Sequence, residues 1–385
     1  MKVSIVIPSF NRRRILAKSL AALWRQEIPA GSPIDDYEVV VVDDGSTDGT
    51  AELAATREAA AGGLRLLRQT RSGPAAARNA GVAAARFETI CFIDSDLVPV
   101  PGFLHAHGEA LAEASARDPR CFTSGPVIDT TRFDDPESEP RKVTDYSRAF
   151  FATGNVMLAR RWLDEAGGFD QDFGVYGWED LELGVRLRRL GVRLVRAPGA
   201  VGYHWHPAFS FAEWPALLAR EDERARSALV FLRKHPTPAV KLMIQRTWPQ
   251  RVLWEVLTGA GGFDAIVYRP LAGWLLAAGR PHLALAVARV MLNRHYVRAL
   301  YGAGRRLAPK THAAGEARVV GDPEQFARPT PWVPIDWSVT SPIAVGRQRR
   351  PHRNSASQPV LRYGLTNCCL PLGSLPTGGM AGHPA

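Results

Sequence analysis

One stretch decides the fold: Val39-Val40-Val41-Val42-Asp43-Asp44-Gly45-Ser46. Four consecutive β-branched residues are typical of a strand that is covered on both faces, as the strands of a parallel sheet are. Glycine and serine directly after such a run are typical turn residues. The stretch therefore predicts a buried parallel strand whose carboxyl end carries two acidic side chains.

Strand-like and helix-like segments alternate on both sides of this stretch. Short apolar runs predict further strands over residues 3–7, 64–67 and 89–93. Helical patterns predict helices over residues 14–26, from about residue 47 with Ser46 or Thr47 as N-cap, and over residues 73–86. The alternation predicts an α/β fold, a doubly wound and mostly parallel sheet with helices on both sides.

The pattern changes after residue 100, and it predicts three regions. Residues 1–210 are predicted as the α/β domain, with later elements at residues 101–116 (helix), 122–128 (strand), 179–190 (helix) and 193–196 (strand). Residues 211–301 are predicted as a helical extension, since Trp, Leu and Arg are interleaved there. Residues 302–385 are rich in Pro, Gly, Ser and Arg, which predicts a mostly disordered basic tail.

Composition limits the class of protein and its compartment. The chain has 385 residues, of which 46% are hydrophobic and 22% charged, as in a globular protein of two or three domains. Four cysteines without a CxxC pair favour neither a disulfide framework nor a zinc site, and a reducing cytoplasm is the simplest compartment. We expect no signal peptide, and no spanning helix because no apolar run reaches roughly 18–20 residues.

The net charge of +10 is unevenly distributed along the chain. Residues 1–225 carry 27 Lys and Arg against 32 Asp and Glu, whereas residues 226–385 carry 21 against 6. The basic half also contains Trp248, Trp254 and Trp274 among apolar runs. This pattern predicts either a helical region on the anionic inner face of the cell membrane or an ordinary helical subdomain with a solvated basic face. We expect no nucleic acid as a partner, because the excess belongs to one half.

Polar side chains follow three of the predicted strands, at Pro8 and Asn11, at Asp43 and Asp44, and at Asp94-Ser95-Asp96. In a doubly wound sheet these carboxyl ends meet at a ligand-binding crevice. Asp94 and Asp96 can reach one Mg²⁺ or Mn²⁺, which usually also binds substrate phosphates, so a diphosphate is the expected ligand. The alternative is a turn with two solvated aspartates, which an isolated D-x-D would favour.

Three other phosphate-binding classes lack their motifs in this chain. A phosphatase of the haloacid dehalogenase type needs the D-x-D on its first strand, and the first strand here has no Asp. A dinucleotide-binding fold needs G-x-G-x-x-G after the first strand, and that motif is absent, as is a P-loop.

Five motifs follow one another over residues 2–210: 4–11 (SIVIPSFN), 42–48 (VDDGSTD), 77–81 (ARNAG), 92–96 (FIDSD) and 177–183 (GWEDLEL). Together and in this order they resemble the motifs of the family 2 glycosyltransferases. The resemblance implies the GT-A fold, a nucleotide-sugar donor, a divalent Mn²⁺ or Mg²⁺ ion, and transfer of the sugar to a hydroxyl with inversion. The acceptor would be a saccharide, a lipid-linked saccharide or a small molecule.

The resemblance also implies roles on the donor side for Pro8, Asn11, Asp43, Asp44, Arg78, Asp94 and Asp96. Of Asp43 and Asp44, one would bind the nucleoside base or ribose, and the other would cap a helix. Arg78 would pair with the diphosphate or hold an acidic loop.

The metal ligands implied by the resemblance come from two places in the sequence. Asp96 would bind the ion, and Asp94 would contact the ribose or bind the ion through water. In the segment Gly202–Pro207, His204 would complete the metal shell, with His206 as the second choice.

The acceptor side would be formed around the predicted helix at residues 179–190. Asp180 is the preferred general base, because a carboxylate at a helix N-terminus tends to remain ionised, and Glu179 is the alternative. Trp178 would be an exposed platform for a sugar face, or else a core residue. Asn155 resembles a family position on the acceptor side, with a structural loop as the alternative.

These roles imply a metal-assisted direct displacement at the anomeric carbon. A second hypothesis is a noncatalytic membrane-surface or scaffolding protein that retains a nucleotide-sugar fold. The basic helical region and tail motivate it, and the complete set of acidic residues argues against it.

Overall fold

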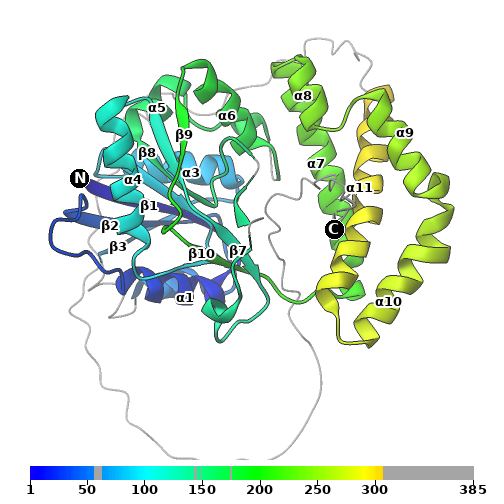
Figure 1. The fold of residues 1–385 in the computed structure, drawn as a ribbon, viewed down its shortest axis with the longest axis horizontal. Coiled ribbons are helices and arrows are strands. Elements are labelled where there is room, and N and C mark those ends of the chain that lie inside the picture. Colours follow the sequence, from blue (N-terminus) through cyan, green and yellow to red (C-terminus); the bar gives the residue numbers. More distant parts are fainter. Residues whose placement is uncertain (56–62, 143–144, 148, 174–175, 307–385) are drawn as a thin grey trace, which may run out of the picture. The chain divides into compact units, whose positions relative to one another are not determined.

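The computed structural model describes residues 1–55, 63–142, 145–147, 149–173 and 176–306. It confirms an α/β fold with a mostly parallel main sheet, which is followed by C-terminal helices (Figure 1). Two sheets are present among these residues, and the carboxyl ends of strands from both approach one place.

The main sheet consists, in spatial order, of β3 (Leu64–Arg68), β2 (Asp36–Asp43), β1 (Lys2–Ser9), β4 (Thr89–Ile93), β8 (Asn155–Ala159), β6 (Cys121–Ser124) and β9 (Arg193–Arg196). β1 to β4 are parallel to one another, whereas β8 is antiparallel to both of its neighbours. The direction of the strand order reverses at β1, between β2 and β4. The carboxyl ends of strands at such a reversal form a crevice, where α/β sheets bind ligands.

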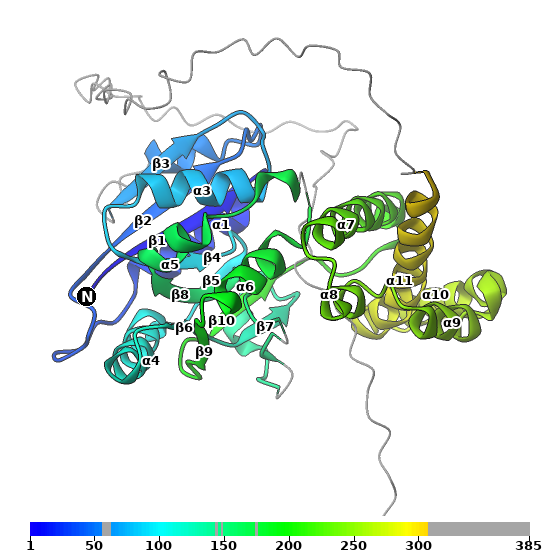
Figure 2. The ribbon, with the colours of Figure 1, turned by 90° about the horizontal axis from the view of Figure 1, so that it is seen from above.

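The helices of this part are α1 (Arg13–Trp24), α3 (Pro74–Ala84), α4 (Phe103–Arg117), α5 (Arg160–Ala166) and α6 (Glu179–Arg189). Ile5 of β1 packs on one face of the sheet in a cluster with α1 and α4. Val6 packs on the other face with α3, α5 and α6. Figure 2 shows α3 and α4 on opposite sides of the sheet. Helices therefore cover both faces, as the run of consecutive apolar residues predicts.

A second sheet consists of β5 (Leu97–Pro99), β10 (Gly202–Trp205) and β7 (Val127–Thr130), with β10 in the middle. β10 pairs with β5 so that His204 lies opposite Leu97, and with β7 so that His204 lies opposite Asp129. The second sheet thereby brings a histidine from the end of the α/β region next to the residues that follow β4.

The single strand predicted over residues 122–128 is wrong, because the chain passes from one sheet to the other within it. β6 ends at Ser124 in the main sheet, and β7 begins at Val127 in the second sheet. Pro126 lacks the N–H that a continuous ladder needs. A side chain at Gly125 would place its Cβ 1.9 Å from the carbonyl oxygen of Ala200, so a residue without a side chain is required there.

The helix predicted from about residue 47 is wrong for the residues that the structure describes. Ser46 and Thr47 belong to a turn, and a short 3₁₀ helix at Ala51–Ala55 follows. Ser46 Oγ accepts a hydrogen bond from the backbone N–H of Asn11 at 2.8 Å, so it joins two loops instead of capping a helix. Residues 56–62, where the predicted helix would continue, lie outside the described residues.

The helical extension contains α7 (Trp214–Lys234), α8 (Pro238–Met243), α9 (Trp248–Leu257), α10 (Arg269–Ala277) and α11 (Pro281–Arg306). α11 contacts α7, α9 and α10, so it is the central helix of this group. α11 ends at Arg306, so residues 302–306, predicted as part of the tail, are helical; residues 307–385 lie outside the described residues. No helix of the described part is long and apolar enough to cross a membrane.

A buried polar network holds α4 against β6 and β8. The ring of His107 lies with Nδ1 2.8 Å from Thr123 Oγ1 and Nε2 2.7 Å from Asn155 Oδ1. The side-chain amide of Asn155 donates to the carbonyl oxygens of Pro126 and Ala200, so its Oδ1 is the acceptor. Nε2 of His107 is therefore the donor in its contact with Asn155. Burial lowers the pKa of His107 to about 4, and the hydrogen bond to Asn155 opposes this shift.

The depressed pKa of His107 predicts a component of stability that is lost in acid. The unfolded chain binds the proton near pH 6.5 and the folded chain near pH 4, so the contribution is full above pH 6.5 and falls as the pH drops toward 4. We expect the free energy of unfolding of wild type and His107→Gln to converge by about 2 kcal/mol between pH 7 and pH 5. Urea unfolding at several pH values measures this difference.

His105→Gln is the matched control for this measurement, because His105 lies half-buried on the same helix and contacts only Ser32 and Glu109 among the polar groups. The control should keep the wild-type pH profile. A constant difference between wild type and His107→Gln across this pH range would contradict the assignment of a neutral buried His107.

Candidate active site

A cleft of about 230 Å³ opens at the carboxyl ends of β1, β2 and β4. Pro8 and Asp44 line it from the ends of β1 and β2, and Asp94 and Asp96 line it from the residues after β4. The first two residues of α6 line it as well. The sheet thus brings together polar groups that are far apart in the sequence, as the strand ends predict.

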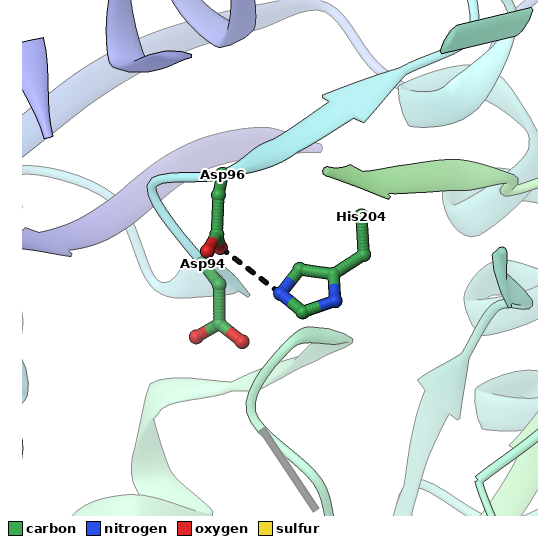
Figure 3. A group of neighbouring side chains, drawn as sticks. All are labelled: Asp94, Asp96 and His204. Atoms are coloured by element: carbon green, nitrogen blue, oxygen red, sulfur yellow. Dashed lines mark ion pairs between the residues drawn. The ribbon is translucent and has the colours of Figure 1, made fainter. Parts of the chain in front are cut away.

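Asp94, Asp96 and His204 form a compact group within this site (Figure 3). One ligand atom from each lies within 4.8 Å of the others, and all three side chains are buried. Nε2 of His204 is 3.2 Å from Oδ1 of Asp96. Two carboxylates and an imidazole are a ligand set suited to a transition-metal dication such as Mn²⁺, whereas Mg²⁺ and Ca²⁺ prefer oxygen alone. The group could therefore hold a divalent metal ion.

Asp129 of β7 fixes the orientation of the His204 ring. Its Oδ1 lies 3.1 Å from Nδ1 of His204, which leaves Nε2 directed toward Asp96. A carboxylate behind a histidine is a common way of orienting a metal ligand. His206 does not belong to this group, because its Nδ1 faces the carbonyl oxygen of Pro207. Of the two histidines, the geometry favours His204.

Burial and opposite charges shift the protonation of this group. Burial would raise the pKa of Asp96, but the neighbouring charges of His204 and Arg12 lower that pKa to about 2. Burial would lower the pKa of His204, but Asp96 and Asp129 raise it well above its usual value. Burial raises the pKa of Asp94, and Arg78 offsets only part of this. A metal ion between these groups would take the place of the proton on His204, so its binding would release protons.

Two arginines neutralise the carboxylates that follow β4. Nη1 of Arg12 lies 3.1 Å from Oδ2 of Asp96, and Nη2 of Arg78 lies 3.3 Å from Oδ1 of Asp94. Arg78 also reaches Oε1 of Glu179 at 3.0 Å and lies over the ring of Phe169. Of the two roles predicted for Arg78, the structure shows the contact with acidic groups, and the contact with a diphosphate stays a prediction.

Asp43 and Asp44 have different surroundings, although they are adjacent. Asp43 is fully buried, and its Oδ1 accepts a hydrogen bond from the backbone N–H of Ser46 within its own turn. Asp44 lines the cleft, and its carboxylate accepts from the backbone N–H groups of Ser72 and Gly73 at the start of α3. Asp44 therefore ties the loop before α3 to the end of β2, and neither aspartate caps a helix, contrary to the prediction for one of the pair. Of the two, Asp44 lines the cleft.

The loop after β1 is tied to the loop after β2. Asn11 has a left-handed backbone (φ 53°), and its Oδ1 accepts from the backbone N–H of Thr47 at 2.8 Å. Asn11 does not line the cleft, whereas Pro8 does. The contacts of Asn11 are those of a residue that holds the two loops together, and its predicted donor contact stays a prediction.

The start of α6 distinguishes the two candidate bases. Glu179 and Asp180 both line the cleft and are 8% and 6% exposed. Glu179 is held by the ion pair with Arg78, whereas Oδ1 of Asp180 accepts from the backbone N–H of Leu181 at 2.8 Å. Both lie in the first turn of α6, where the helix dipole favours the ionised carboxylate.

Trp178 is buried in a core cluster, as its core alternative predicts, but it also lines the cleft, so the predicted exposed position is wrong and the acceptor contact stays a prediction. The side chain is 5% exposed and packs near Phe231 and Tyr296. Its indole N–H donates to the backbone oxygen of Arg224 at 3.0 Å. The physical reason is that α7 and α11 cover this position, and these helices come long after it in the chain.

Asn155 is buried and lies outside the lining of the cleft, and its predicted contact with an acceptor stays a prediction. The residue is 2% exposed, and its side chain lies in the network with His107. The reason is that β8 begins at Asn155 and directs the residue into the interior. Asn155 therefore has a structural role, as its alternative predicts, but it lies on a strand and not in a loop.

Three arginines that line the cleft are not predicted from the sequence: Arg12, Arg71 and Arg224. Arg12 directly follows the motif residue Asn11, and Arg71 lies three residues before the start of α3, so their nearness to motifs could have identified them. The guanidinium of Arg71 lies 4.2 Å from the ring centroid of Phe10. Arg224 comes from α7, and no local pattern connects it with the site.

Comparison with known proteins gives matches to two family descriptions. Residues 4–167 match Glycosyl transferase family 2, and residues 138–207 match the N-terminal domain of galactosyltransferase. Together they span the motifs and the residues of the cleft that come before the helical extension.

Several curated proteins are similar in sequence. The chain is 32% identical to chondroitin synthase of Escherichia coli over 244 residues, which cover 53% of this chain and 35% of that protein. It is 30% identical to validoxylamine A glucosyltransferase of Streptomyces hygroscopicus subsp. jinggangensis, covering 61% of each. It is 37% identical to glycosyltransferase AglE of Haloferax volcanii, covering 55% of this chain and 68% of that protein. The chain thus spans about a third of the synthase.

Solved structures give a further match. A mannosyltransferase from Pyrobaculum calidifontis in complex with GDP-Man and Mn²⁺ is 21% identical, with a TM-score of 0.49, over 78% of this chain and 87% of that one.

The buried group predicts which variants lose metal. We expect Asp96→Asn and His204→Gln to weaken Mn²⁺ binding at least about tenfold, and Asp129→Asn to weaken it about tenfold through the orientation of His204. Titration of Mn²⁺ followed by electron paramagnetic resonance measures the affinity without any need for turnover. His206→Gln is the matched control and should bind as wild type does. Normal binding by His204→Gln would show that the ion is held elsewhere.

Proposed function

The chain belongs to glycosyl transferase family 2, and from this premise we propose that it moves a sugar from a nucleotide-sugar donor to a hydroxyl of an acceptor, with inversion. The observation that supports the proposal is one cleft lined both by Asp94 and Asp96, which together with His204 could hold a metal ion, and by the two carboxylates at the start of α6. A noncatalytic scaffold would not need this complete set. We assign the transfer to residues 1–210 and regard residues 211–301 as a helical extension.

The donor would bind along the carboxyl ends of β1, β2 and β4. A divalent ion held by Asp94, Asp96 and His204 would stabilise the negative charge that develops on the leaving diphosphate. Asp44 lines the cleft beside the start of α3, where its carboxylate can accept from the donor's base or ribose. Arg71 is exposed at the cleft and supplies a positive charge on the same side.

The acceptor would be activated at the start of α6. We assign the general base to Asp180, which lines the cleft in the first turn of α6, where the helix dipole favours the ionised carboxylate. The acceptor oxygen forms a bond to the anomeric carbon, the bond from that carbon to the diphosphate oxygen breaks, and the hydroxyl proton passes to Asp180. A single displacement of this kind inverts the configuration of the anomeric carbon.

The acceptor class is proposed as a carbohydrate or a lipid-linked saccharide. The curated relatives include a chondroitin synthase, a hyaluronan synthase and a validoxylamine A glucosyltransferase, and the acceptors implied by these names are hydroxyl-rich molecules. A cleft rich in carboxylates and arginines suits such a ligand, because hydroxyl groups both donate and accept hydrogen bonds.

Replacement of the proposed base should separate chemistry from binding. We expect Asp180→Asn to slow sugar transfer by about 10²–10⁴-fold, because the amide cannot take the hydroxyl proton, while the affinity for the nucleotide sugar is retained. Glu179→Gln should lower the melting temperature of the protein, because Arg78 then keeps only one of its two ion-pair partners. Transfer assays and calorimetric donor titrations of the variants measure both effects.

Asp164→Asn is the control, since Asp164 is exposed on α5 outside the cleft. It should transfer sugar as wild type does. Full transfer by Asp180→Asn with normal donor binding would remove Asp180 from the mechanism.

A panel of nucleotide sugars should identify the donor and the stereochemistry. We expect a matching donor to raise the melting temperature in the presence of Mn²⁺, because a ligand that binds only the folded chain stabilises it. An α-linked donor should then give a β-linked product, which proton NMR of the anomeric hydrogen reports. A product with retained configuration would contradict the single displacement, and a panel without any stabilising donor would contradict the donor site.

A further inference from the structure

The large apolar side chains exposed to solvent are concentrated in one segment of the chain. Within the described residues, every large apolar side chain with substantial exposure lies between Leu242 and Leu283, from α8 to the beginning of α11. An exposed apolar surface of this kind in an otherwise well-covered protein marks a place of interaction. In Figure 1, α9 and α10 follow one another along α11 within the helical extension, and both helices contact α11.

On α9, one side of the helix is apolar and faces away from the protein. Trp248, Val252 and Val256 follow one another at intervals of four residues and are 75%, 48% and 68% exposed. The other side of α9 packs inward through Trp254, whose indole N–H donates to Oε1 of Gln245. The exposed stripe is therefore not required to hold α9 in place.

The segment around α10 has the same arrangement. Ile266, Leu271 and Trp274 are 76%, 40% and 62% exposed, whereas Ala272 and Leu275 are buried in a cluster with α11. We use the name outer face for six exposed apolar side chains of α9, of α10 and of the turn before α10: Trp248, Val252, Val256, Ile266, Leu271 and Trp274.

The charges of this segment are mainly positive toward solvent. Residues 238–285 contain two acidic side chains, Glu255 and Asp264, and both form ion pairs with Arg294 of α11, at 3.8 and 3.1 Å. Arg294 is 7% exposed, whereas the side chains of Glu255 and Asp264 are 41% and 29% exposed, so both acidic groups of the segment lie beside a buried arginine but still reach solvent. Four further basic side chains are exposed in the same segment: Lys241, Arg251, Arg269 and Arg280.

We propose that the outer face docks on an anionic lipid bilayer, with Trp248 and Trp274 at the level of the headgroups and the four exposed basic side chains against lipid phosphates. Tryptophan prefers this level, because its ring is apolar and its N–H needs a polar partner. Basic residues beside an inserted apolar face add attraction to anionic lipids. A second copy of this chain is disfavoured as occupant, since it would bring two sets of unpaired positive charges together.

Docking of this kind would hold the enzyme at a membrane without a spanning helix. The inference goes beyond the proposed transfer reaction and does not depend on it, because it rests on side chains of α8 to α10 that lie outside the cleft.

Vesicle binding by the full-length protein tests the proposal. We expect wild type to co-sediment with phosphatidylcholine vesicles that contain phosphatidylglycerol, and much less with phosphatidylcholine alone. Trp248→Ala/Trp274→Ala should lower the partition coefficient at least about tenfold through lost apolar burial. Replacement of Lys241, Arg251, Arg269 and Arg280 by Gln should lower it at least about tenfold, and added salt should weaken wild type in the same direction.

A matched control removes the same number of charges elsewhere. Arg117, Arg161, Arg189 and Arg193 are exposed on the α/β region, and their replacement by Gln should leave vesicle binding unchanged. Trp248→Phe/Trp274→Phe should keep binding but lose most of the fluorescence quenching that brominated lipids produce in wild type. Melting temperatures verify that each variant is folded.

Two results would overturn the proposal. The first is undiminished vesicle binding by the Trp→Ala and Lys/Arg→Gln variants, which would place the contact in another part of the chain. The second is a lack of binding to either vesicle; if sedimentation velocity then showed a dimer that Trp248→Ala/Trp274→Ala dissociates, the outer face would belong to a second copy.

Discussion

The buried guanidinium of Arg78 joins the end of β4 to the start of α6, through ion pairs with Asp94 and Glu179. Both carboxylates lie in the wall of the cleft and have little contact with water. Ionised carboxylates in such surroundings are stable only with a positive partner, and loss of the partner from a buried pair costs about 3–5 kcal/mol. The relative position of the end of β4 and the start of α6 in the wall of the cleft therefore depends on one arginine of α3.

A second group of charges is organised around Asp96. Arg12 approaches it from the loop after β1, and His204 approaches it from β10 of the second sheet. The small sheet serves to place His204, because its register sets that residue beside Leu97, one position after Asp96. Asp96 is thus surrounded by positively charged groups from segments that are distant in the chain. A divalent ion bound there would add further positive charge beside the same carboxylate.

The elements of the α/β region follow from local patterns in the sequence. Buried strands such as β1 and β2 consist of β-branched runs, and α6 has acidic residues in its first turn and basic residues in its last. Residues 122–128 do not follow the pattern, because their division between two sheets depends on a close approach to Ala200. The sequence after Asp43 is typical of a helix start. In the structure Ser46 instead accepts a hydrogen bond from the backbone N–H of Asn11, in the loop after β1.

The sequence by itself determined which chemical groups are present and at which strand ends they stand. Asp44, Asp94 and Asp96 reach one cleft because parallel strands present their carboxyl ends at one edge, and Asp180 joins them from the start of α6. Only the tertiary structure decided which neighbours each group has. Trp178 is a core residue because α7 and α11 cover it, and Asn155 is a structural residue because β8 directs it toward His107. Burial and pairing are set by contacts between segments distant in the chain, and no local pattern records them.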